Sequence, residues 1–402
     1  MPARKPLKIA VGMSGGVDSS VAAALLKERG FDVLGVFLHF WSETIEGKIR
    51  DNICCSLESQ EDARRVCQKL RIPFYTLNME APFKEKIVDE FFLEYQNCRT
   101  PNPCVRCNQF IKFGEMWKKL RPMNVDCIAT GHYALVKAQN PKLKAQMKFK
   151  TKNLKSILRG SSTALAVASH LRMTIPSFKL LKGKDKNKDQ SYFLHQSTQE
   201  QLAHILFPVG DLTKAEVRSL AKKFGLPTAS KIESQEICFI PGADTSEFLK
   251  RHLRLKKGAI KEIETGRVLG EHDGLALYTI GQRKGIRLAG GPWYVVSFNK
   301  TDNVLLVSRE EAKISSSRFI VGNVNWISGV EPKFPLKTKC RVRSQASEVD
   351  CVVNKNKSTG YRVDLVKPER AITPGQYCVF YGDDECLGGG VIKLDQRDKQ
   401  VK

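Results

Sequence analysis

The sequence lacks any apolar run long enough to cross a membrane. None reaches the roughly 18 consecutive apolar residues of a transmembrane helix, although apolar residues make up 42% of the 402 residues. The basic start, Met1 to Lys8, leads straight into a strand-like stretch, LKIAVGM. Neither a signal peptide nor an amphipathic presequence fits there. We therefore expect a cytoplasmic protein without a membrane partner, and the length suggests two or three domains.

Acidic residues are scarce. The chain has 42 Asp and Glu against 66 Lys and Arg, a net charge of +24. A charge of that size indicates a polyanionic partner, most commonly nucleic acid, and an anionic membrane or an acidic protein is the alternative. Residues 137–190 hold 14 basic and 2 acidic residues, which is +12 of the +24.

The first third of the chain alternates between strand-like and helical patterns. We expect strands at Leu7–Val11, Val33–Phe40, Phe74–Leu77 and Cys127–Thr130, and helices at Val17–Arg29, Leu57–Lys69 (capped by Ser56) and Ile87–Tyr95. Further helices are expected at Gln199–Leu206 and at Lys214–Phe224, the latter capped by Thr213 or Asp211. Alternating strands and helices predict a parallel sheet with helices on both faces, an α/β fold.

Two other regions have a different texture. Residues 137–179 interrupt the alternation and form either a basic hairpin or a mobile insertion. From Leu275 onward short β-type runs recur between turn residues, which is typical of an antiparallel barrel or sandwich. We predict a catalytic domain over 1–210, a small central domain over 211–274 and a β-barrel over 275–395.

A glycine-rich turn joins the first strand to the first helix. It reads Gly12-Met13-Ser14-Gly15-Gly16-Val17-Asp18-Ser19. Two glycines allow an anion close to the backbone, the hydroxyls can donate, and a helix N-terminus favours negative charge. The Lys of a P-loop, G-x-x-x-x-G-K-[ST], is missing, and so is G-x-G-x-x-G. The turn therefore predicts a phosphate site of another kind.

Few of the twelve cysteines suggest chemistry. A secreted disulfide scaffold would be shorter and carry a leader, so most are expected to pack in cores. Cys104 and Cys107 form a C-x-x-C after two prolines, near Arg99 and Arg106. Cationic neighbours and a helix N-terminus lower a thiol pKa. Half a zinc site is the alternative, but a second compact C-x-x-C is missing; a thioredoxin-like context is missing as well.

Several strings in fixed order identify a family. The chain contains SGGVDS, TPNPCVRCN, GHYA, KDQSYFL, SQEICF, YTIGQRKG and PGQYCVFY. SGG-x-DS resembles the PP-loop of the ATP pyrophosphatases, and the whole set resembles the tRNA-specific 2-thiouridylases, sulfurtransferases that thiolate the wobble uridine of tRNA. The resemblance covers nearly the whole chain except the insertion.

The resemblance implies an ATP- and Mg²⁺-dependent reaction in which ATP adenylates the 2-oxygen of the uridine. Gly12 to Ser19 would bind the phosphates, Asp18 would help to hold Mg²⁺, and Leu38 would contact the adenine. Gly131 follows the strand at 127–130, at the sheet edge where open α/β sheets bind ligands.

The resemblance also implies a sulfur route. Cys238 would receive sulfur as a persulfide from a relay protein or a cysteine desulfurase. Cys107 would attack the persulfide or pass the sulfur on, and could close a disulfide with Cys238 that must then be reduced. Many relatives carry Asp where this chain has Cys104. Three thiolates could instead ligate a [4Fe–4S] cluster, so Cys104, Cys107 and Cys238 leave two sulfur mechanisms open.

The tRNA contacts follow from the same resemblance. Asn102, Pro103 and Cys104 would border the flipped uridine, with His132 beside it, although His132 could equally be a structural histidine. The remaining candidates for tRNA contact are Lys188, Asp189, Gln190, Arg341, Val342 and Gln376. The Lys-rich insertion would add nonspecific grip or only solubility.

Two other functions are compatible with parts of this pattern. A PP-loop synthetase acting on a small molecule would need neither the large positive charge nor the paired cysteines. An RNA-binding protein with an inactive nucleotide loop would not need the intact SGGVDS.

Overall fold

The computed structural model describes residues 6–45, 48–50, 56–138, 178–232, 237–240, 244–356 and 360–393, and the side chains of 45–50 are not among them. The N-terminal domain is built on a parallel sheet in the order β5-β2-β1-β6-β9. Its strands are β1 (Lys8–Met13), β2 (Asp32–His39), β5 (Phe74–Asn78), β6 (Cys127–Ala129) and β9 (Ile205–Leu206). All four pairings are parallel, as the alternating pattern predicts.

The helices of this domain bury apolar side chains. They are α1 (Val17–Glu28), α2 (Leu57–Leu70), α3 (Glu80–Phe83), α4 (Asp89–Gln96), α5 (Pro103–Arg106), α6 (Met116–Leu120), α10 (Gln199–Leu202) and α11 (Lys214–Lys223). Ser56 caps α2 as predicted, by accepting from the backbone N–H of Ser59. Of the two candidate caps for α11, Thr213 is the one used, in a reciprocal capping box with Glu216.

One predicted helix is wrong in its second half. The pattern over Gln199–Leu206 predicts a single helix, but α10 ends at Leu202 and Ile205–Leu206 form the edge strand β9. Both residues of β9 are buried, and they pair with Ile128 and Ala129 of β6. A short apolar run suits a helix or a strand equally, and the open edge of β6 decides in favour of the strand.

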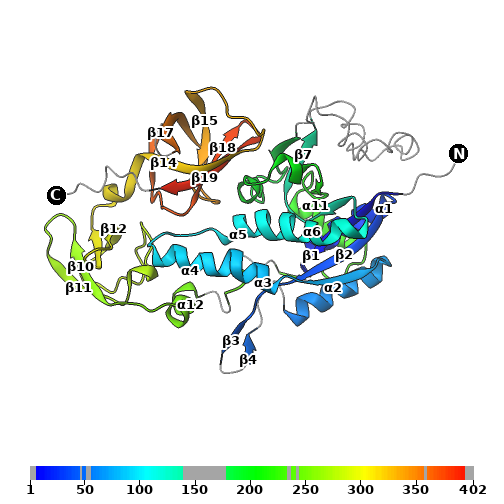
Figure 1. Ribbon diagram of the computed structural model, residues 1–402, viewed down its shortest axis with the longest axis horizontal. Helices are drawn as coiled ribbons and strands as arrows, with labels where there is room; N and C mark the ends of the chain where they lie inside the picture. Colours follow the sequence, from blue (N-terminus) through cyan, green and yellow to red (C-terminus); the bar gives the residue numbers. More distant parts are fainter. Residues whose placement is uncertain are drawn as a thin grey trace.

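Two π-helical segments join short α-helices into longer continuous helices. The π-helical η1 (Lys84–Val88) joins α3 to α4, and η2 (Cys107–Glu115) joins α5 to α6. The 3₁₀ segments are η3 (Arg121–Met123), η4 (Ser191–Leu194), η6 (Leu275–Leu277) and η7 (Glu311–Ile314). A small hairpin, β3 (Glu43–Ile45) and β4 (Lys48–Arg50), projects beyond the sheet (Figure 1). Every helix within the described ranges is too short or too polar to cross a bilayer.

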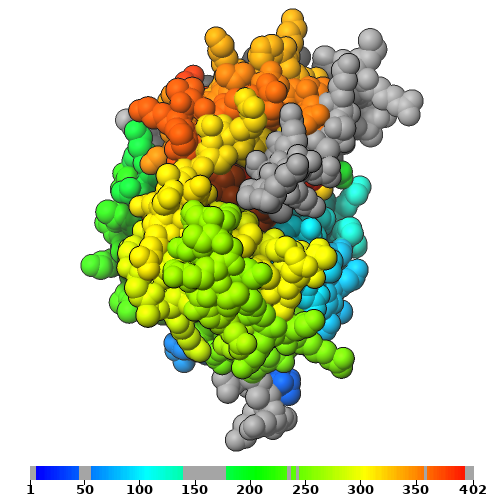
Figure 2. All heavy atoms as spheres, turned by 90° about the vertical axis from the view of Figure 1, so that its left-hand side faces the viewer, coloured from blue at the N-terminus to red at the C-terminus, as the bar shows by residue number. Residues whose placement is uncertain are grey.

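A middle domain follows the helix α12 (Thr245–His252). Its sheet has the order β11-β10-β13-β12, formed by β10 (Gly258–Glu262), β11 (Val268–His272), β12 (Tyr294–Asn299) and β13 (Val304–Ser308). Ile260, Val295, Leu305 and Val307 fill its core. Figure 2 shows this domain, in yellow-green and yellow, covering one end of the molecule below the orange strands of the last domain.

The C-terminal domain is an antiparallel barrel. Its strands are β14 (Ser315–Trp326), β15 (Leu336–Arg341), β16 (Val349–Asn356), β17 (Gly360–Arg370), β18 (Tyr377–Gly382) and β19 (Glu385–Lys393). The pairing of β14 with β19 closes the ring. The hairpin of β7 (Ala134–Ala138) and β8 (Phe178–Lys182) adds to this sheet through β19. Most of the basic insertion, residues 139–177, lies outside the described residues.

The antiparallel barrel confirms the fold predicted for the end of the chain, and the domain limits at 210 and 274 stay a prediction. Figure 1 shows α4 and α5 running through the centre of the molecule, with the barrel above them and the middle domain at one end. The segment between these two helices, residues 97–102, therefore lies where the three domains meet.

Candidate active site

The loop between β1 and α1 requires glycine at its tip. Gly15 has a φ of +70°, and a Cβ atom there would lie 2.3 Å from the backbone oxygen of Ser59 in α2. Gly16 caps α1 without a side-chain hydrogen bond, so the first N–H groups of the helix face the loop. Together with the positive end of the helix dipole, they suit a bound phosphate.

Serine hydroxyls brace this loop. The hydroxyl oxygens of Ser14 and Ser19 lie 3.2 Å apart, and the backbone N–H of Ser14 also donates to Ser19 Oγ at 3.2 Å. Ser20 Oγ donates to the Gly16 carbonyl at 2.8 Å. The other residues predicted for this site lie in β1 or at the start of α1: Gly12, Met13 and Val17.

The structure brings Gly131 to the same place. A Cβ atom on Gly131 would lie 2.6 Å from the backbone nitrogen of Ser19 and 2.7 Å from the carbonyl carbon of Asp18. The turn after β6 therefore packs directly on the first turn of α1. Leu38 lies at the carboxyl end of β2, the strand next to β1, and is 7% exposed.

Asp18 is held by two residues that sequence reasoning missed. The hydroxyl of Tyr133 donates to Asp18 Oδ1 at 2.7 Å. Lys214 Nζ donates to both carboxylate oxygens, at 2.7 and 2.8 Å. Lys214 is the first residue of α11 and lies 196 positions from Asp18. Its only local signal was its place directly after the helix cap.

The C-x-x-C segment begins a helix. Asn102 caps α5, with its Oδ1 accepting from the backbone N–H of Val105 at 3.4 Å, and Pro103 is the first helical residue. Cys104 is exposed, whereas Cys107, one turn later, is 6% exposed. The two thiols therefore lie in different surroundings, and Cys104 faces solvent.

Carboxylates neutralise the cations near these cysteines. Arg99 Nε donates to Glu94 at 2.7 Å, and Arg106 forms an ion pair with Glu90. Burial raises the pKa of Glu90 while Arg106 opposes that effect. The arginines expected to activate the cysteines are thus already paired with acids.

Cys238 lies against the same apolar core that contains Cys107. The next residue, Phe239, places its ring 5.2 Å from that of Phe91 in α4 and 5.7 Å from that of Phe83 in α3. Residues 234–236 of the SQEICF string lie outside the described residues.

A metal site made of three cysteine ligands is not favoured by this arrangement. Across the described residues, which include Cys104, Cys107 and Cys238, no three His, Cys, Asp or Glu side chains are grouped closely enough to hold a metal ion. The residues present therefore do not fit a three-cysteine iron–sulfur site.

His132 is held as a neutral imidazole. Its Nδ1 lies 2.8 Å from the hydroxyl of Thr130. The centres of the Phe113 and Phe207 rings lie 6.1 and 5.8 Å from the centre of the His132 ring. Burial, aided by the charge of Lys112, holds the pKa of His132 well below its ordinary value. The imidazole can hydrogen-bond, but it carries no charge toward a phosphate at neutral pH.

Two of the predicted tRNA contacts pair with each other. Asp189 Oδ2 accepts from Arg341 Nη1 at 3.2 Å and from the hydroxyl of Ser191 at 2.9 Å. The side chain of Asp189 is 2% exposed and that of Arg341 is 15% exposed. This ion pair joins the N-terminal domain to β15 of the barrel. The barrel residue Val342 is buried too, at 4% exposed.

The neighbouring predicted contacts also make bonds within the protein. Gln190 and Tyr133 exchange two hydrogen bonds, each 2.9 Å, through the backbone of Tyr133. Lys188 closes a turn by donating its backbone N–H to the Asp185 carbonyl at 3.0 Å. This segment therefore connects the candidate tRNA contacts with the tyrosine that holds Asp18.

Gln376 clamps the segment that precedes the paired cysteines. Its Nε2 donates to the carbonyls of Thr100 and Pro101, at 3.0 and 3.3 Å. The backbone N–H of Thr100 donates to Pro374 at 2.8 Å. Thr100 Oγ1 lies 3.1 Å from Thr279 Oγ1 in the middle domain. Barrel and middle domain together fix the start of α5.

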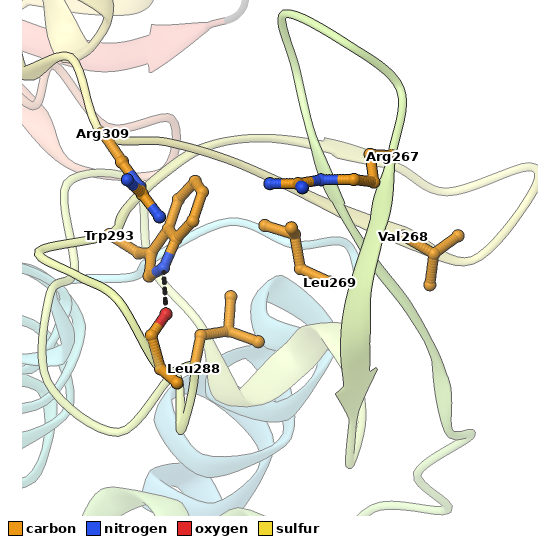
Figure 3. Close-up of a pocket in the computed structure, with 7 residues that line it drawn as sticks. Arg267, Val268, Leu269, Leu288, Trp293 and Arg309 are labelled. Carbon is orange, nitrogen blue, oxygen red and sulfur yellow. Dashed lines mark hydrogen bonds between the residues drawn. The ribbon is translucent and has the colours of Figure 1, made fainter.

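A cavity of about 290 Å³ lies elsewhere, in the middle domain (Figure 3). The guanidinium carbon of Arg309 lies 4.6 Å from the centre of the Trp293 ring, and Arg267, the residue before β11, also lines the cavity. Its lining contains none of the predicted site residues, so this cavity does not mark the place of the chemistry. The site is instead defined by the glycine loop, Asp18 and the cysteines near α5.

Parallel sheet, glycine loop and paired cysteines define a nucleotide-binding α/β protein with a β-barrel attached. The chain matches three family models in succession: a tRNA methyl transferase HUP domain over residues 7–242, a tRNA methyl transferase PRC-barrel domain over 246–309 and an aminomethyltransferase β-barrel domain over 316–392. These matches cover each of the three structural domains in turn.

Curated relatives match the chain along nearly its whole length. It is 42% identical over 395 residues to tRNA-specific 2-thiouridylase MnmA 1 of Caldanaerobacter subterraneus subsp. tengcongensis, covering 97% of this chain and 99% of that one. It is 40% identical over 391 residues to tRNA-specific 2-thiouridylase MnmA of Roseiflexus, covering 96% and 100%. The chain belongs to the tRNA-specific 2-thiouridylase family.

Proposed function

We propose that this protein replaces the 2-oxygen of the wobble uridine of tRNA by sulfur, at the expense of ATP. The observation that carries the proposal is the glycine loop, closed by Gly131, in a chain that is about 40% identical to 2-thiouridylases from end to end. The net charge of +24 suits a tRNA substrate, and the cytoplasm is where we expect the reaction.

The first step is adenylation of the uridine. The 2-oxygen of the base attacks the α-phosphate of ATP, and pyrophosphate leaves into the glycine loop. Backbone N–H groups at the start of α1 stabilise the negative charge that develops on the leaving group. Mg²⁺ binds proteins through one or two carboxylates plus substrate phosphates, and Asp18, at the start of α1, would supply one carboxylate.

The second step delivers the sulfur. A relay protein or cysteine desulfurase leaves a persulfide on Cys238. The Cys107 thiolate attacks the inner sulfur, which forms the Cys107–Cys238 disulfide and releases hydrosulfide. Hydrosulfide attacks carbon 2 of the adenylated uridine, and AMP departs with the oxygen. Two electrons from an external thiol then reduce the disulfide for the next turnover.

Exposure supports these assignments. Cys107 is 6% exposed, which shields a reactive sulfur from solvent, and Cys238 lies against the same core. Cys104 is exposed at the start of α5, beside Asn102 and Pro103. We assign these three residues to the rim that surrounds the flipped base.

Nucleoside mass spectrometry tests this proposal. Unmodified tRNA transcripts with a wobble uridine would be incubated with protein, ATP, Mg²⁺ and a persulfide donor, without air. We expect 2-thiouridine with the wild type and none with Cys107→Ala or Cys238→Ala. Cys127→Ala is the matched control, because burial raises the pKa of that thiol to about 12 and it should not react.

Other outcomes would overturn the proposal. Activity that survives Cys107→Ala would remove the persulfide route. Cleavage of ATP to pyrophosphate without tRNA, and without thiouridine under any donor, would indicate a synthetase for a small substrate. Loss of activity with Cys104→Ala, together with iron and sulfide in the purified protein, would restore the cluster mechanism.

A further inference from the structure

The glycine loop carries no cation of its own. A P-loop places a lysine beside the phosphates, but residues 12–20 of this chain include neither Lys nor Arg. Pyrophosphate is a strongly charged leaving group, so backbone N–H groups alone leave much of its charge uncompensated. The structure brings an ammonium group to this loop from another part of the chain.

That group belongs to Lys214. Its Nζ lies 2.7 and 2.8 Å from the two carboxylate oxygens of Asp18, the second residue of α1. The side chain of Lys214 is only 12% exposed, and that of Asp18 is 28% exposed. The ammonium group of a largely buried lysine thus contacts the second residue of α1, the helix whose N-terminus faces the glycine loop.

The backbone of Lys214 is anchored independently of its side chain. Its backbone N–H donates to Asp185 Oδ2 at 3.0 Å, directly after the capping box of α11. Val217 and Ala221 of the same helix are fully buried in the core that also contains Val21 of α1. The four-carbon stem is therefore anchored at its base, while its head can rotate between nearby acceptors.

Tyr133 provides Asp18 with a second hydrogen-bond donor. Its hydroxyl donates to Asp18 Oδ1 at 2.7 Å, so the carboxylate keeps a donor when the ammonium moves away. The backbone of Tyr133 is held by Gln190 on both sides. The carboxylate thus stays in place and its cation can be exchanged.

We propose that Lys214 is the phosphate-binding lysine of this enzyme, supplied by α11 instead of by the loop. Without nucleotide it neutralises Asp18. With ATP bound, its ammonium turns to the β- and γ-phosphates and stays with the pyrophosphate as it leaves. The inference rests on the proposed function, because it assumes that ATP occupies the glycine loop.

Ligand binding without tRNA or sulfur donor tests the inference. Calorimetry would compare pyrophosphate, ATP and adenosine, each with Mg²⁺, on wild type and Lys214→Met. One charge-assisted contact corresponds to a loss of about 10- to 100-fold in affinity. We expect that loss for pyrophosphate and ATP, and none for adenosine, which has no phosphate. Lys223→Met removes the same charge from the exposed end of α11 and should change nothing.

A double-mutant cycle separates direct from indirect action. If Lys214 contacts phosphate, Lys214→Met weakens pyrophosphate binding in the Asp18→Asn background too. If it only orders Asp18, the loss disappears there, and the proposal is wrong. Affinity for pyrophosphate that is unchanged or tighter in Lys214→Met would show that Lys214 is merely a counter-ion of Asp18.

Two further results keep a folding defect apart from a binding defect. Lys214→Arg retains the charge and should retain most of the pyrophosphate affinity, whereas an equal loss in Arg and Met variants would indicate a structural role and overturn the proposal. If the wild type binds neither ATP nor pyrophosphate, the proposed function fails instead. The two failures are therefore distinguishable.

Discussion

At the scale of single residues, Gly15 is required both by its left-handed backbone conformation and by the close approach of α2. Its φ is +70°, and an added Cβ atom would overlap the backbone of Ser59. Gly266 has the same φ of +70° but nothing within 4 Å of the added atom. The two glycines thus separate the conformational cost of a side chain from the cost of a steric clash.

We expect Gly266→Ala to lower the free energy of unfolding by about 1–2 kcal/mol, from left-handed backbone strain alone. Gly15→Ala should cost about 1–3 kcal/mol more because α2 must move, and it should also weaken ATP binding. Urea unfolding and calorimetry measure both. Equal costs at the two positions would show that α2 gives way freely.

His195 offers a second prediction at this scale. Burial lowers its pKa from its ordinary value of 6.5 to about 4. Its Nδ1 lies 2.6 Å from the Tyr192 carbonyl, so that nitrogen is the donor in the neutral ring. Between pH 6.5 and pH 4, His195 is protonated in the unfolded chain but stays neutral in the folded protein. The folded state therefore loses stability as the pH falls toward 4.

The expected loss from this residue is about 1.4 kcal/mol per pH unit between pH 6.5 and pH 4. Urea unfolding of the wild type and of His195→Asn, at several pH values in that window, measures it. The other histidines contribute to both curves, so the difference in slope is the readout. Parallel curves would show that His195 becomes protonated in the folded protein.

At the scale of elements, the segment at 97–102 is held from outside its own domain. Gln376 and Pro374 come from the barrel, and Thr279 comes from the middle domain. Gly375 completes the clamp, because a Cβ atom there would lie 2.9 Å from the backbone nitrogen of Thr100. The paired cysteines are therefore positioned by all three domains.

We expect Gln376→Leu to slow 2-thiouridine formation by about tenfold, because misplacing a reacting group by about 1 Å can cost 100-fold. ATP affinity should stay unchanged, since the glycine loop lies on β1 and α1. The measurements are the rate of thiolation at saturating tRNA and ATP affinity. Gln60→Leu is the control, because it removes an exposed hydrogen bond from Gln60 Nε2 in α2 to Thr76 Oγ1.

A different result would reassign the residue. Gln376 is also a predicted tRNA contact. If Gln376→Leu raises KM for tRNA and leaves the rate at saturation intact, the amide serves the tRNA rather than the clamp.

At the scale of the whole molecule, positive charge dominates. Residues 139–177 contain eight basic and no acidic residues, a third of the net charge of +24. The two strands that flank this stretch form a hairpin, and Ala138 lies opposite Phe178. A two-residue turn can therefore replace the stretch without disturbing the barrel sheet.

We expect that replacement to weaken tRNA binding and to flatten its salt dependence, since each phosphate contact contributes roughly 0.7–0.9 to the slope of log affinity against log salt. Filter binding between about 50 and 200 mM salt measures it. ATP affinity should not change. An unaltered slope would assign the stretch to solubility instead of grip.

Those parts of the fold that depend on local pattern could be predicted from the sequence. Periodic apolar residues predicted the parallel sheet and its main helices, Ser56 marked a helix start, and alternating short runs predicted the barrel. The glycine loop and the C-x-x-C were visible because each is continuous along the chain. The strand β9 was missed because two apolar residues have no period.

Contacts between residues far apart in the sequence could not be predicted and became visible in the folded protein. Lys214 reaches Asp18 across 196 positions, Gln376 reaches Thr100 across 276, and Asp189 pairs with Arg341 across 152. Such contacts leave no trace in local composition, because a lysine at a helix start or a glutamine before a strand looks like solvated surface until the domains pack. Packing among the three domains gives these residues their partners.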